Sequence, residues 1–101
     1  MQKYDIKALV TNKRTSGKFF ATGYRPAFQI LDDYLTTGEI TLINKDILQV
    51  NETGEAFIRF LTPEVYPKSL SIGKKIVFKE GDFITGEIIV VAIFNQILEA
   101  K

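Results

Sequence analysis

The chain has 101 residues, of which 46% are apolar and 25% are charged, and this suits one small globular domain. Its formal net charge of +1 provides no global attraction to nucleic acid or to an anionic membrane. The lack of cysteine excludes disulfides and thiolate metal sites, and the lack of histidine removes the commonest general base and metal ligand.

The first ten residues contain charges and lack the apolar block of a secretory signal. The longest apolar run, residues 88–94, is too short to span a bilayer. We therefore expect a cytoplasmic protein with no membrane partner.

The dominant sequence period is two, which predicts β-strands at residues 4–11, 39–42, 55–61 and 74–79. In residues 87–94, every position after Glu87 is apolar, which predicts a strand that is covered on both sides. In the alternating strands, these residues are predicted to point inward: Tyr4, Ile6, Ala8, Val10, Ile40, Leu42, Ala56, Ile58, Phe60, Ile76 and Phe78.

Turn-forming residues separate the strands at residues 15–17, 22–23, 51–54 and 80–82. Pro63 and Pro67 bracket a connection that a central strand would not tolerate. Short strands at this spacing predict an all-β domain, a small antiparallel barrel or sandwich. The tail at residues 95–101 is predicted to add one helical turn or to fray.

Other charged residues receive structural interpretations. Asp32 and Asp33 are adjacent, so they converge poorly for acid–base work and are expected to cap backbone amides in a turn. Lys74, Lys75 and Lys79 are expected to protect a sheet edge against aggregation.

The stretch FFATGYRPAFQI, residues 19–30, and the following TTGEITLI, residues 36–43, resemble the third, C-terminal domain of elongation factor Tu-type translational GTPases. The resemblance continues through FKEGDFITGEIIV, residues 78–90. It implies a six-stranded antiparallel Greek-key barrel over about residues 4–94, with residues 95–101 as a tail. The whole chain, residues 1–101, would then be one stand-alone domain.

The GYRPAF motif also has a physical interpretation. Gly23 permits a left-handed backbone, and Pro26 fixes its own φ and favours extended geometry before it. Tyr24 and Phe28 can bury their rings under the barrel end. Arg25 is then part of a structural corner or, alternatively, a binding residue.

Two features of the translational GTPases are missing or altered. No phosphate-binding glycine loop is present, so we expect no nucleotide binding and no cofactor. The resemblance implies tRNA contacts around residues 16–18 and at the late hairpin. At that hairpin, Asp82 and Phe83 replace a glycine and an arginine of the family, so a cation is lost where a phosphate would lie.

No serine, threonine or lysine has an evident activating base, so the chain is predicted not to be an enzyme. In the family, this barrel packs against two other domains, and the faces opposite the predicted core remain apolar here. We therefore predict a binding module that engages a protein partner or itself. The outward apolar residues are Leu9, Phe57, Leu61, Val77, Ile89 and Val91.

An RNA-binding module is the alternative. Lys13, Arg14, Lys18 and Arg25 could gather beside aromatic rings at one barrel end, with Phe83 available for base stacking. A solvated loop over core aromatics is the competing interpretation of the same residues.

Overall fold

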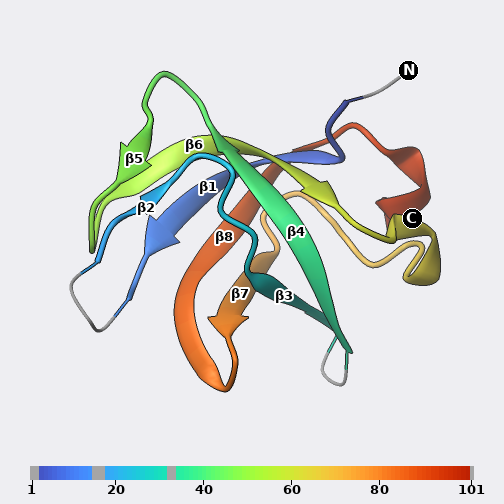
Figure 1. The fold of residues 1–101 in the computed structure, drawn as a ribbon. Helices are drawn as coiled ribbons and strands as arrows, with labels where there is room; N and C mark the ends of the chain where they lie inside the picture. Colours follow the sequence, from blue (N-terminus) through green and yellow to red (C-terminus); the bar gives the residue numbers. More distant parts are fainter. Residues whose placement is uncertain (1–2, 15–17, 32–33, 101) are drawn as a thin grey trace.

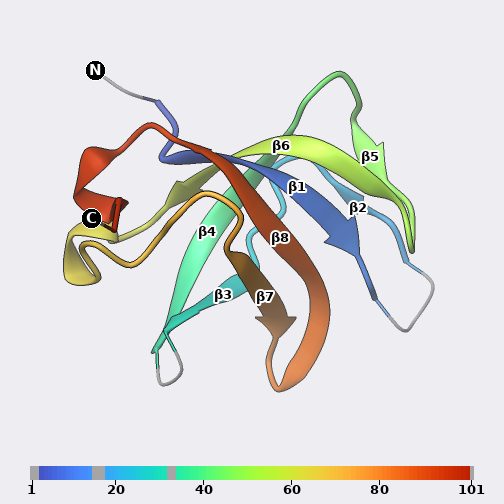
Figure 2. The same cartoon turned by 180° about the vertical axis from the view of Figure 1, so that it is seen from behind.

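The computed structural model describes residues 3–14, 18–31 and 34–100, and the long strands of this part close into an antiparallel barrel (Figure 1, Figure 2). The order around the barrel is β1-β6-β4-β3-β7-β8, and β8 pairs back with β1. The barrel strands are β1 (Ile6–Asn12), β3 (Ala27–Leu31), β4 (Tyr34–Leu42), β6 (Thr53–Phe60), β7 (Lys75–Glu80) and β8 (Phe83–Ile93).

The connectivity is a Greek key. Three successive barrel strands, β3, β4 and β6, lie side by side, and β7 then returns to pair with β3. The predicted six-stranded antiparallel barrel is therefore confirmed. Two short strands that the sequence pattern did not indicate, β2 (Phe20–Ala21) and β5 (Ile47–Leu48), pair in a separate small sheet.

Alternation along the strands places the core. The predicted inward residues of the alternating strands are buried, from Ile6 in β1 to Phe78 in β7. Tyr4 is the exception, because it precedes β1 and stacks on the ring of Phe57 at 4.7 Å between centroids. Gly86 makes room for the core, since an added Cβ would lie 2.1 Å from Phe78 Cζ.

The prediction that residues 87–94 are covered on both sides is wrong. In β8, Ile88 and Val90 are buried, whereas Ile89 and Val91 are each 37% exposed. A closed barrel has one interior, so only alternate residues of each strand can enter it. Alternate residues of this β-branched run fill the core, and the others leave apolar side chains on the outer surface.

The connection after β6 and the tail close one end of the barrel. The 3-10 turns η1 (Pro63–Val65) and η2 (Gln96–Leu98) lie side by side there (Figure 1). The buried carboxylate of Asp5 joins the start of η2 to β6 by accepting hydrogen bonds from Phe60 N (2.7 Å) and Asn95 Nδ2 (3.0 Å). Of the two alternatives predicted for the tail, one helical turn or fraying, the structure shows the turn, as η2.

The expectation that three lysines protect a sheet edge is wrong. Strand β7 pairs with β3 on one side and β8 on the other. Lys74 Nζ donates to the carbonyls of Ser69 (2.7 Å) and Ile30 (3.3 Å), and Lys75 pairs with Glu87 at 3.3 Å.

The predicted turn at residues 15–17 and the Asp32–Asp33 pair lie outside the described residues. In the part that is described, no helix is both long and apolar enough to cross a membrane.

Candidate binding sites

The GYRPAF stretch forms a corner. Gly23 has a φ of 93°, and its N–H donates to Ile40 O at 2.7 Å, while Ile40 N donates back to Tyr24 O at 2.9 Å. Pro26 and Phe28 are buried, and the Tyr24 ring stacks on Phe20 with centroids 4.4 Å apart. Gly23, Tyr24, Pro26 and Phe28 therefore form a structural corner of the barrel.

The phenol of Tyr24 lies at the end of the barrel that holds the β7–β8 turn. Its hydroxyl donates to the carboxylate of Glu80 and also hydrogen-bonds Thr85 Oγ1 at 2.9 Å. Burial, reinforced by the Glu80 carboxylate, raises the pKa of Tyr24 to about 12. The phenol is therefore a fixed hydrogen-bond donor at neutral pH.

The predicted basic loop is organised by Asn12, a buried polar residue that the sequence analysis did not single out. Asn12 Nδ2 donates to Leu48 O at 2.9 Å and to Lys18 O at 3.1 Å, and its Oδ1 accepts from Arg14 N at 3.0 Å. An asparagine in place of an inward apolar residue at the end of β1 was the available signal.

Two cations of this loop are paired with glutamates. Lys13 Nζ lies 2.7 Å from Glu87 Oε1, and this hydrogen bond lowers the pKa of Glu87, with Lys75 adding to the effect. Arg14 Nη2 lies 3.0 Å from Glu80 Oε2, while its Nη1 donates to Phe19 O at 2.8 Å. Their charges are therefore balanced locally by carboxylates.

The other predicted contact residues have different surroundings. Arg25 pairs at 3.0 Å with Glu39 of β4, whereas Arg14 pairs with Glu80 of β7. Phe83 is 76% exposed beside the β7–β8 turn. Lys18 is exposed, and no ion pair within the described residues involves it.

Apolar side chains point outward on the neighbouring strands β6, β1 and β8 and just after β8. This group is here called the outer apolar face: Leu9, Phe57, Ile89, Val91 and Phe94. Leu9 and Ile89 are direct cross-strand partners, and each is 37% exposed, as is Val91. Phe57 lies with its centroid 6.1 Å from that of Phe94, which is 42% exposed. Most of the predicted outward apolar residues thus gather on neighbouring strands.

Ion pairs lie within and beside this face. Lys7 of β1, the cross-strand partner of Phe57, pairs with Glu55 of β6 at 3.2 Å. Glu87 of β8, two residues before Ile89, accepts both Lys13 and Lys75, at 2.7 and 3.3 Å. Charges of both signs therefore lie next to the apolar side chains.

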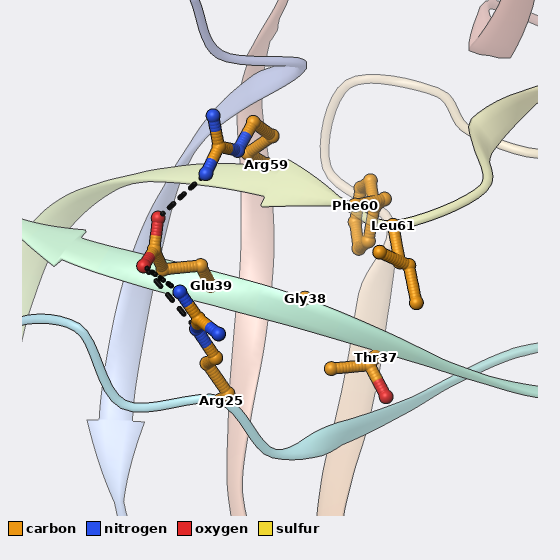
Figure 3. A pocket seen from close by; sticks show the side chains of 7 residues that line it. All are labelled: Arg25, Thr37, Gly38, Glu39, Arg59, Phe60 and Leu61. Atoms are coloured by element: carbon orange, nitrogen blue, oxygen red, sulfur yellow. Dashed lines mark hydrogen bonds and ion pairs between the residues drawn. The ribbon is translucent and has the colours of Figure 1, made fainter.

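A pocket of about 320 Å³ lies over β4 and β6, and Figure 3 shows its lining. Arg25 donates from Nε and Nη2 to Glu39 Oε2 at 3.3 and 3.0 Å, and Arg59 Nη2 donates to Oε1 at 3.2 Å. We call this the arginine pocket, and its lining is Arg25, Thr37, Gly38, Glu39, Arg59, Phe60 and Leu61.

Arg25 and Leu61 of this pocket were predicted as a contact residue and an outward apolar residue, whereas Arg59 and Glu39 were not predicted as site residues. Both lie outward in predicted strands, and Glu39 is the cross-strand partner of Arg59. Only the pairing of β4 with β6 brings them together.

Among residues 3–14, 18–31 and 34–100, no group of three or more acidic side chains is arranged to hold a metal ion. No family model matches the chain, and no curated protein matches it.

Proposed function

We propose that this chain is a non-enzymatic protein-binding module whose contact surface is the outer apolar face, and that a second copy of the chain occupies it. The observation that carries the proposal is the register of Leu9 against Ile89, which sets exposed aliphatic side chains together across β1 and β8. A contiguous exposed apolar patch with a polar rim is typical of protein interfaces.

The charged groups of the face support a second copy as the occupant. In a two-fold contact, the same face meets itself, so it must be self-complementary. Both signs are present beside the apolar side chains, in the Lys7–Glu55 pair and in the Lys13–Glu87–Lys75 group. A rotated copy can therefore place lysines against glutamates around the apolar centre.

We also propose descent from the third domain of elongation factor Tu-type GTPases. The Greek-key barrel and the corner built by Gly23 and Pro26 support this relationship. A shared fold does not transfer function, so a role in translation needs its own evidence. The proposal includes a cytoplasmic location, which fractionation of cells that contain the tagged chain tests.

Sedimentation velocity over a wide concentration range tests the association. We expect the wild-type chain to dimerise and Ile89→Lys to remain monomeric, because a lysine would bring an unpaired charge into the contact centre. Leu35→Lys is the matched control, because Leu35 is also an exposed aliphatic residue but lies on β4. A wild-type chain that stays monomeric at every concentration, or an Ile89→Lys chain that dimerises, contradicts the proposal.

The RNA-binding alternative depends on Lys18 and Phe83, since Lys13 and Arg14 are paired with glutamates. It predicts tRNA binding that weakens steeply with salt and that Lys18→Glu reduces in a folded chain. Such binding by monomeric protein would replace the protein-docking proposal.

A further inference from the structure

We propose that the arginine pocket binds a small monocarboxylate that carries a short apolar chain. The pocket lies on the outer side of β4 and β6, and its residues are not those of the outer apolar face. The inference is therefore independent of the proposed self-association.

The arginine pocket carries an excess of positive charge. Two arginines share one glutamate, so two cations and one anion leave one positive charge. The side chains of Arg25 and Arg59 are 66% and 56% exposed, whereas that of Glu39 is 24% exposed. The excess positive charge is thus directed to solvent, where it can balance a monoanion.

The two guanidinium groups of the pocket are held in place by Glu39. Figure 3 shows Arg25 and Arg59 on opposite sides of Glu39, each reaching its own carboxylate oxygen. Glu39 holds both planar groups, and the guanidinium N–H groups that do not point at it remain available to a ligand. Guanidinium forks match the planar geometry of a carboxylate, and holding them in advance reduces the entropy lost on binding.

One end of the pocket has an apolar lining. Leu61 is 74% exposed and lies at the end of the pocket away from the Arg25–Glu39 hydrogen bonds, next to Phe60 and Thr37 (Figure 3). A ligand whose carboxylate accepts from the guanidinium N–H groups that do not point at Glu39 can cover Leu61 with an alkyl chain. The volume of about 320 Å³ is at the lower end of the range for ligand pockets, which fits a small molecule.

The test is an NMR titration of the ¹⁵N-labelled full chain with hexanoate, acetate and hexanamide at constant ionic strength. We expect hexanoate to shift the backbone amides of residues 37–39 and 59–61 with saturation. Acetate should bind more weakly because it lacks the chain, and hexanamide more weakly because it lacks the charge. The absence of saturable shifts at these amides, or equal binding of hexanoate and hexanamide, would overturn the proposal.

Variants locate the two halves of the ligand. Arg59→Gln should weaken hexanoate binding on the order of tenfold, since it removes a charge-assisted hydrogen bond. Lys18→Gln removes the same formal charge from the loop at the far end of the β1–β6 pair and should leave binding unchanged. Equal losses in both variants would reduce the effect to general charge attraction and overturn the site.

Leu61→Ser tests the apolar half. It should bring the affinity for hexanoate down to that for acetate while leaving acetate binding unchanged. Both arginines remain in this variant, and Leu61 is mostly exposed, so the barrel should stay folded. A preference for hexanoate that persists in Leu61→Ser would overturn the assignment of the chain to this end of the pocket.

Discussion

The two sides of β8 differ in a way that their residue types do not reveal. Residues 88–91 read Ile-Ile-Val-Val, so each side receives one isoleucine and one valine. Ile88 and Val90 are 0% and 1% exposed in the core, whereas Ile89 and Val91 are each 37% exposed. Identical side chains thus serve the fold on one side and remain available for a contact on the other.

The comparison predicts different consequences for the same substitution. An inward side chain is surrounded by close-packed neighbours, so its removal leaves a cavity. An outward side chain borders solvent, which fills the space that it leaves. The following predictions test this difference, in order of expected effect on stability.

Ile88→Ala should have the largest effect. Ile88 is fully buried, so the loss of its side chain should lower the free energy of unfolding by about 3 kcal/mol. Urea denaturation followed by circular dichroism measures this change. A loss below about 1 kcal/mol would show that the inner side of β8 is loosely packed.

Gly86→Ala tests the same inner side by overpacking. The added Cβ would lie 2.1 Å from Phe78 Cζ and 2.5 Å from the backbone oxygen of Thr11, so moving the ring alone cannot relieve the clash. We expect a loss of about 2 kcal/mol in the same assay. Gly54→Ala is the control, because the nearest atoms to its added Cβ belong to side chains and not to the backbone, the closest being Leu48 Cδ1 at 3.0 Å. An equal loss in both variants would indicate a backbone effect instead.

The buried phenol of Tyr66 predicts that the free energy of unfolding falls at alkaline pH. Burial raises the pKa of Tyr66 to about 12, above its ordinary value of 10, so the folded state favours the neutral phenol. Between pH 10 and pH 12 the unfolded chain ionises this group before the folded chain does. The stability contribution is therefore present below pH 10 and is lost as pH rises through this window.

Urea unfolding at pH 9 and pH 11 measures this loss. The drop between the two values should be about 1 kcal/mol smaller for Tyr66→Phe than for the wild-type chain. Other titrating groups are common to both proteins, so the difference isolates Tyr66. Equal drops would show that the phenol is accessible to solvent.

Ile89→Ala should have the smallest effect on the fold. Measured at a concentration where the chain is monomeric, it should lower the free energy of unfolding by about 0.5 kcal/mol, because the side chain is already partly hydrated. Association at higher concentration should nevertheless weaken. A loss equal to that of Ile88→Ala would mean that the two sides of β8 do not differ.

Local patterns were sufficient to predict much of the barrel. Alternation assigned Ile6, Ile58 and Phe78 to the core, and the structure buries all three. The turn at residues 80–82 was visible in Gly81, which has a φ of 62° between β7 and β8. These features depend on neighbours within a few residues, which is the range over which a sequence pattern acts.

The candidate sites could be predicted only in part. Arg25 and Leu61 were named for separate reasons, and nothing in the chain order indicated that Arg59 and Glu39 would join them. Two cations of the predicted RNA-contact cluster are likewise paired with distant residues, since Lys13 meets a glutamate 74 residues away and Arg14 one that is 66 residues away. The charge of a surface depends on such distant partners.

The sequence alone determined the all-β class, the strand periodicity and the corner at Gly23, because backbone preferences and alternation are local. Tertiary structure decided which side of β8 faces solvent, which cations are neutralised and which two arginines share Glu39. A closed barrel admits one side of each strand to its core and fixes every register around the ring. Those registers place residues distant in the chain within contact of one another, and the candidate binding surfaces depend on them.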